Sequence, residues 1–143
     1  MIAGACTVRV RYSDTDAMRV AHHTRHVAWF EVGRTELLRA AGYPYERLEG
    51  EGIGLPVIDM TLRFRAAARY DDLLRIETKV ADATPVLVTF EYAIRRPTDD
   101  RLLATGRTDH AAVDMAFRRV RLPQSVRDVL TGEGFFDTAG APC

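Results

Sequence analysis

Reactive side chains are densest between Tyr12 and His26, in the stretch YSDTDAMRVAHHTRH. Asp14 and Asp16 come first, and three histidines follow where a strand-like pattern gives way to a helical one. A helix start exposes unpaired peptide N–H groups and the positive end of the helix dipole, so it stabilises negative charge placed against it. A carboxylate beside it could attack an ester or thioester carbonyl, or activate water, while the N–H groups stabilise the charge on the carbonyl oxygen.

The same residue types also have plainer roles. Asp and Thr before a helix are usually capping or loop residues. His22 and His26 have helical spacing and could bind a metal, but no HExxH pattern or cysteine ligand accompanies them, so we expect no metal site. We interpret His26 as a surface or packing residue, and His22 and His23 as neighbours of the pocket that the loop forms.

Hydrophobic periodicity predicts the elements that position these residues. Alternating apolar and arginine residues predict a strand over residues 7–12. Apolar residues at helical spacing predict one long helix over residues 24–41, which Gly42 ends. The later patterns predict strands over residues 58–65, 74–80, 86–94 and 102–115, a short helix over residues 125–130 after Pro123, and a flexible tail over residues 133–143.

This order of elements predicts an α+β domain, in which an antiparallel sheet packs on one long helix. A chain of 143 residues has room for a single domain. Such a sheet leaves exposed edges, which favours a homo-oligomer.

The amino-acid composition limits the kinds of partner and the cellular location that we expect. Twenty Lys and Arg residues balance twenty Asp and Glu residues, so we expect no nucleic-acid partner. The chain shows no basic leader with an apolar run and no stretch of about eighteen apolar residues, so we expect no membrane span and a cytoplasmic location. Cys6 and Cys143 are interpreted as free thiols without a function.

On these residues the sequence resembles the hotdog-fold acyl-CoA thioesterases of the 4-hydroxybenzoyl-CoA thioesterase and YbgC type. That family shows a strand ending in YxDTD, a His or Tyr seven residues after the second Asp, and a helix reading FExxRxExL. The matching parts here are residues 12–16, His23 and WFEVGRTELLRAAG from Trp29. The stretch LPVIDMTLRFRAAARYDDLLRIET resembles the family's second and third strands, so the resemblance runs over residues 8–122.

The resemblance implies a single hotdog domain whose five-stranded antiparallel sheet wraps around the long helix. It implies that Asp16 is the catalytic carboxylate, acting as nucleophile or general base, and that Asp14 is structural. It also implies that His23 lies beside the thioester, where its backbone N–H polarises the carbonyl. The substrate would be an acyl-CoA bound across a subunit interface of a homodimer or homotetramer, with no cofactor.

Two departures from the family pattern affect the binding residues. Met18 and Arg19 replace the small, often Gly-containing pair of many members, which makes Arg19 and the nearby His22 candidates for lining the pocket. The start of the predicted fourth strand lacks the basic residues that some relatives place near the CoA phosphates. Possible substitutes, which could equally be a solvated face, are Arg63, Arg65 and Arg69.

Other carboxylates and other functions compete with this interpretation. Glu31 is a rival catalytic acid, although Arg34 three residues later predicts a helix salt bridge instead, and Asp59 is a second rival. His110 and its neighbouring acids lack a Ser or Cys nucleophile, so we expect structural roles for them. The alternative functions are a non-catalytic acyl-CoA-binding protein and a hotdog enoyl-CoA hydratase.

Overall fold

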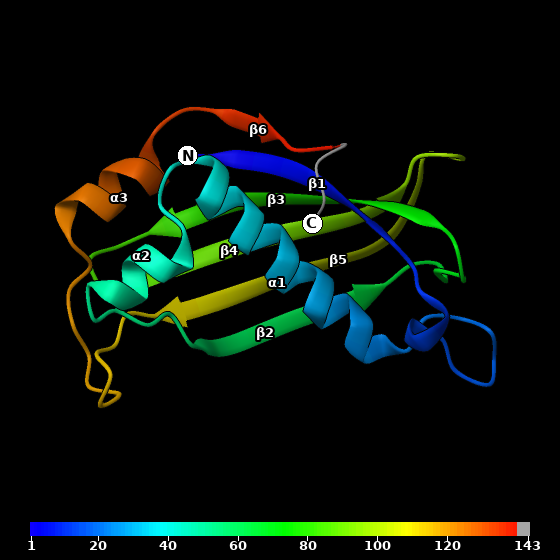
Figure 1. Cartoon of the computed structure of the whole chain (residues 1–143), viewed down its shortest axis with the longest axis horizontal. Helices are drawn as coiled ribbons and strands as arrows, with labels where there is room; N and C mark the ends of the chain where they lie inside the picture. Colours follow the sequence, from blue (N-terminus) through cyan, green and yellow to red (C-terminus); the bar gives the residue numbers. More distant parts are fainter. Residues whose placement is uncertain (140–143) are drawn as a thin grey trace.

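The computed structural model describes residues 1–139, in which one long helix, α1 (His23–Ala40), lies across a six-stranded sheet (Figure 1). The strands follow the order β2-β5-β4-β3-β1-β6 across the sheet. The remaining elements are β1 (Ala3–Arg9), η1 (Tyr12–Asp14), α2 (Tyr45–Gly50), β2 (Val57–Phe64), β3 (Leu73–Ala83), β4 (Leu87–Arg96), β5 (Arg101–Ala111), α3 (Gln124–Thr131) and β6 (Phe135–Asp137).

The α+β class and the long helix are confirmed, the helix to within one residue at each end. The strand count was wrong: the sheet has six strands, because β6 pairs in parallel with β1 in the segment predicted to be a tail. The peptide N–H of Ala3 donates to the Gly134 carbonyl at 3.0 Å, and Phe136 packs against the core. Residues 140–143 of that predicted tail lie outside the described residues.

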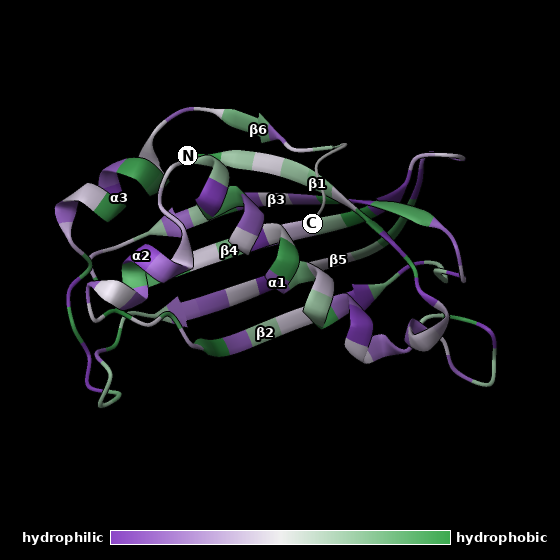
Figure 2. Cartoon of the chain, viewed as in Figure 1, coloured by the Kyte–Doolittle hydropathy of each residue, from purple (hydrophilic) through white to green (hydrophobic). Residues whose placement is uncertain are grey.

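Two further local differences follow from packing that periodicity does not reveal. β1 begins at Ala3 and ends at Arg9, earlier than predicted, because Ile2 and Cys6 are core residues while the chain turns into η1 after Arg11. The short helix α2 was not predicted, and it buries Leu48 against the core. Hydrophobic and hydrophilic residues alternate along the strands and α1, as expected for elements with one buried face (Figure 2).

Close contact fixes α1 on the sheet. Gly33 faces β3 so closely that a Cβ there would lie 2.4 Å from Thr78 Oγ1. Gly106 of β5 leaves room for the Phe30 ring, which stacks on Tyr92 at 4.4 Å between centroids. Because these residues are closely packed, they fix the position of α1, and with it the position of its first turn, relative to the sheet.

A buried polar chain runs beneath the helix between β4 and β5. The Tyr92 hydroxyl pairs with Thr108 Oγ1 at 2.6 Å, and Thr108 Oγ1 pairs with His110 Nε2 at 2.8 Å. His110 Nδ1 lies 2.8 Å from the Leu55 carbonyl oxygen. Burial lowers the pKa of His110 to about 4, so the imidazole is neutral in the folded protein at neutral pH.

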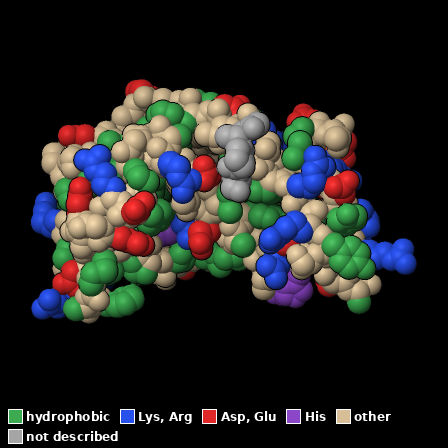
Figure 3. Space-filling view, viewed as in Figure 1, with side chains coloured by type: hydrophobic (Ala, Val, Ile, Leu, Met, Phe, Trp, Pro, Cys, Tyr) green, Lys and Arg blue, Asp and Glu red, His purple; other side chains and the backbone are tan. Residues whose placement is uncertain are grey.

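The helices are short or polar, and charged side chains of both signs cover the visible face (Figure 3). Within residues 1–139, none of the helices has the length and apolar character that crossing a bilayer requires. Acidic and basic side chains are interspersed over the face seen in Figure 3, as the equal counts of the two charges predict.

Because the pKa of His110 falls from its ordinary value of 6.5 to about 4, the unfolded chain binds a proton between these pH values more readily than the folded chain. We therefore expect the free energy of unfolding to fall as the pH drops from 6.5 to 4, by up to about 1.4 kcal/mol per pH unit from this group. Urea unfolding at a series of pH values measures the slope. His110→Gln should flatten it, and parallel wild-type and variant profiles would contradict the assignment.

Candidate active site

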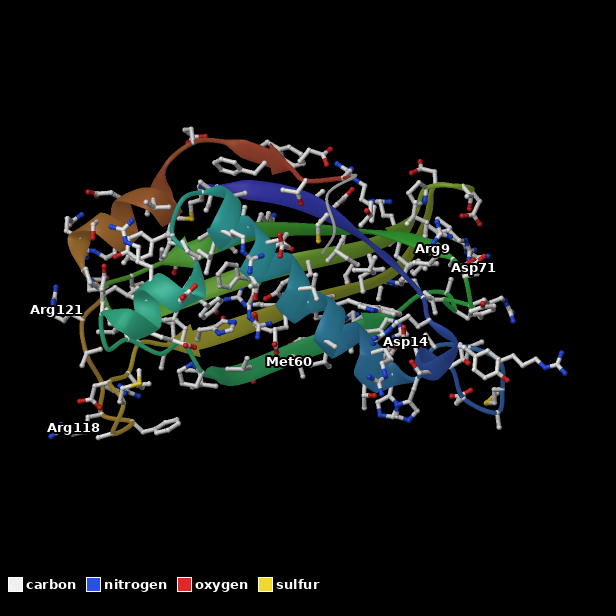
Figure 4. The ribbon with its side chains drawn as sticks, viewed as in Figure 1. Arg9, Asp14, Met60, Asp71, Arg118 and Arg121 are labelled. Atoms are coloured by element: carbon white, nitrogen blue, oxygen red, sulfur yellow. The ribbon has the colours of Figure 1, made fainter. Side chains whose placement is uncertain are left out.

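Asp14 anchors the loop that joins β1 to α1. Its buried carboxylate accepts a hydrogen bond from the Arg11 peptide N–H at 2.8 Å, and Arg25 in the first turn of α1 lies 3.8 Å from the same carboxylate. Its backbone carbonyl accepts from the His22 N–H at 2.8 Å. Asp14 therefore ties the loop to the helix start, and Figure 4 shows it between these elements.

Asp16 lies two residues further on, at the rim of the loop, with an exposed side chain. A tight turn holds it: its N–H donates to the Val20 carbonyl at 3.0 Å, and its carbonyl accepts from the Arg19 N–H at 2.9 Å. One carboxylate oxygen, Oδ1, accepts from the Met18 N–H at 2.9 Å. Arg19 has φ 65°, a left-handed conformation that glycine adopts without strain and other residues adopt less readily.

The first turn of α1 has a free donor. His22 is the N-cap, and its imidazole Nδ1 lies 3.4 Å from the Thr24 N–H. The peptide N–H of His23, the first residue of the helix, has no hydrogen-bond acceptor anywhere in residues 1–139. It is the unpaired, dipole-enhanced donor that a helix start provides.

Asp16 and His23 border one cavity of about 410 Å³, together with His26. The rest of its lining is mostly small or apolar and comes from the loop, the last residue of β2 and the chain just after it: Val20, Ala21, Phe64, Arg65, Ala66, Ala67 and Ala68. A carboxylate and a free peptide N–H at one cavity can act on the two sides of a carbonyl group.

His26 was interpreted as a surface or packing residue, and the structure shows that it packs in the interior and also lines the cavity. Its side chain is buried between the rings of Trp29 and Phe64, yet it also lines the cavity. Burial lowers the pKa of His26, against the opposing effect of the His23 and His22 carbonyls. His26 follows His23 by three residues, which places both on one face of α1. This spacing was the feature of the sequence that could have indicated that His26 lies at the same cavity as His23.

The candidate binding residues separate into those at the cavity and those elsewhere. Arg65 lines it. Arg63 alternates with Phe64 on β2 and lines a different cavity, on the opposite face of the sheet. His22 caps the helix with its ring 4.1 Å from that of His23, whereas Arg19 and Arg69 are exposed and outside the cavity lining.

The rival carboxylates lie away from this cavity. Glu31 forms the predicted salt bridge with Arg34 at 3.7 Å, and its side chain is 71% exposed. Asp59 is exposed on β2, on the face that Arg63 shares. Asp114 accepts hydrogen bonds from the backbone of its own turn. Within residues 1–139, no group of three or more His, Cys, Asp or Glu side chains could hold a metal ion.

Fold and site together define a hotdog domain with a carboxylate beside the start of its central helix. The Thioesterase-like superfamily matches residues 10–130. The acyl-CoA thioesterase YbgC of Haemophilus influenzae is 34% identical over 122 residues, covering 84% of this chain and 88% of the relative. The chain belongs to the thioesterase-like superfamily, and the resemblance to thioesterases of the YbgC type is confirmed.

Solved structures agree with this assignment. DHNA-CoA thioesterase from Staphylococcus aureus is 27% identical with a TM-score of 0.83, and the match covers 90% of this chain and 86% of that one. A variant of 4-hydroxybenzoyl CoA thioesterase bound to 4-hydroxybenzoyl CoA has a TM-score of 0.82 at 17% identity, covering 90% and 99% of the two chains, and shows the fold alone. The hotdog fold and membership of a family of thioester hydrolases are thus confirmed.

Proposed function

We propose that this protein hydrolyses acyl-CoA thioesters to a free carboxylic acid and CoA, with Asp16 and the start of α1 as its catalytic groups. The observation that carries the proposal is the shared cavity: Asp16 and His23 line the same space, and the peptide N–H of His23 is unpaired within residues 1–139. The YbgC relative, an acyl-CoA thioesterase by name, supports the substrate class.

The reaction follows from these two groups. The thioester carbonyl oxygen accepts a hydrogen bond from the His23 N–H, which stabilises the negative charge that develops there. Asp16 either attacks the carbonyl carbon, expelling the CoA thiolate and leaving an anhydride that water opens, or removes a proton from the water that attacks. Both routes consume one water and release the acid and the CoA thiol.

We also propose that the protein is a homodimer that pairs along β2, with the site at the subunit boundary. β2 is the last strand of the sheet on its side and has no bound neighbour beyond it among the described residues. Its eight residues include Val57, Ile58, Met60 and Phe64, all exposed, and Phe64 also lines the cavity. A long, apolar, unpaired edge is stabilised by pairing with a second copy.

The dimer and the hydrolytic site are coupled by strand geometry. Two copies of β2 related by a twofold axis run antiparallel, so the start of one strand lies beside the end of the other. The partner's start of β2 would then approach Phe64 and the cavity wall behind it.

The cytoplasmic location and the absence of a nucleic-acid partner stay predictions.

Replacing the Asp16 carboxylate should abolish turnover. In Asp16→Asn the amide can neither attack nor accept a proton, so we expect kcat to fall by several orders of magnitude on a panel of aliphatic and aromatic acyl-CoAs, followed by release of free thiol. Asp71→Asn is the matched control, because Asp71 is an exposed loop acid outside the cavity and Asn tolerates its φ of 69°. An unchanged Asp16→Asn rate would remove Asp16 from the mechanism. Saturable acyl-CoA binding without thiol release would indicate a non-catalytic binding protein.

A charge on the β2 edge should separate the subunits. Met60, labelled in Figure 4, is 42% exposed on β2, so Met60→Lys would place two like charges near the twofold axis. We expect the mass measured by analytical ultracentrifugation to fall to that of one chain. Val86→Lys is matched in exposure, at 43%, but lies outside β2 and should stay dimeric. A monomeric wild type, or a dimeric Met60→Lys, counts against pairing along β2.

A further inference from the structure

The imidazole of His26 takes no part in the proposed reaction. Its side chain is 3% exposed, lines the cavity shared by Asp16 and His23, and packs against Trp29 and edge-on against Phe64, with centroids 5.0 and 4.9 Å away. Nδ1 is buried and has no hydrogen-bond partner in residues 1–139. A polar ring this deeply buried costs free energy unless something pairs with it.

The two nitrogens of this ring differ in their surroundings. The carbonyls of His23 and His22 act on the imidazole from the preceding turn, although neither makes a hydrogen bond of normal geometry to Nδ1. Nδ1, the ring nitrogen nearer the backbone, is the one that can direct a proton toward them. In the tautomer that carries its proton on Nδ1, Nε2 keeps its lone pair and can accept a hydrogen bond.

The surroundings of His26 in the cavity are mostly apolar. Phe64 and the run of Ala66, Ala67 and Ala68 supply an apolar surface, while the charged groups of the cavity are Asp16 and Arg65. A plain hydrocarbon lying against this wall would leave the imidazole unpaired, and a group that donates a hydrogen bond would pair with it. Sites that hydrogen-bond a substrate hydroxyl reject the analogue that lacks it far more strongly than apolar pockets reject an extra methylene.

We propose that His26 determines acyl specificity, selecting acyl groups that carry a hydroxyl over their plain hydrocarbon analogues by accepting a hydrogen bond from that hydroxyl. The proposal rests on the proposed thioesterase function and names the class of acyl group that the site takes. It makes His26 a specificity-determining residue and leaves the roles of Asp16 and His23 as they are.

The test uses pairs of acyl-CoAs that differ by one hydroxyl: butyryl and 3-hydroxybutyryl, hexanoyl and 3-hydroxyhexanoyl, and benzoyl with each of its three monohydroxy derivatives. We expect the wild-type protein to show at least about tenfold higher kcat/KM for the hydroxylated member of one or more pairs. His26→Phe keeps an aromatic ring against Trp29 and Phe64 but has no acceptor, so the ratio within the pair should fall toward one. His26→Gln, which retains a hydrogen-bonding group, should keep part of the preference.

The possible results distinguish a failure of the specificity role of His26 from a failure of the proposed thioester hydrolysis. Equal wild-type kcat/KM for both members of every pair overturns the role of His26 while thioester hydrolysis stands, and this result needs no variant to fold. A preference that survives in His26→Phe, or a variant that loses rate equally on both members, also overturns it and makes His26 a packing residue. No thiol release from any substrate refutes the proposed hydrolysis itself, and the specificity proposal with it.

Discussion

The buried carboxylate of Asp14 is the interaction on which the site depends. It bonds the loop backbone at Arg11 and faces Arg25 on α1, while its carbonyl holds the His22 N–H. A buried carboxylate is costly to leave unpaired, so these contacts restrict how far the loop can move relative to the helix. Asp16, only two residues away, is thereby held at the cavity that His23 borders.

Packing on the sheet determines where the start of α1 lies relative to the cavity. Gly33 lets α1 approach β3 to within contact of Thr78, and the helix start then lies over the end of β2, where Phe64 and the alanines that follow form the cavity wall. The N–H of His23 is unpaired because it is the first of its helix, and the loop supplies no acceptor for it. A donor left open by folding is available to a ligand without reorganisation, which is the basis of electrostatic stabilisation at such sites.

Much of this could be predicted from the sequence, and the rest depends on contacts between distant segments. Periodicity identified α1 and the four strands after it, and the YSDTD motif with His23 identified the family. β6 could not be predicted, because a three-residue strand is fixed by pairing with β1 rather than by any pattern of its own. Arg63 and Arg65 looked alike as candidates, yet Arg65 follows the end of β2 and reaches the cavity, whereas strand alternation turns Arg63 to the opposite face. His26 was underestimated because burial at a cavity wall is a property of the assembled fold.

The central claim is that the first peptide N–H of α1 stabilises charge on the substrate carbonyl. His23→Pro deletes that N–H at the one helix position where proline is tolerated, and the extended His22, at φ −62° and ψ 142°, is compatible with a following proline. His23→Ala removes the same imidazole and keeps the N–H. Measured by thiol release from an acyl-CoA, kcat of His23→Pro is expected to be about 10²- to 10³-fold below that of His23→Ala, with both variants folded. Equal kcat values for the two folded variants would contradict the account.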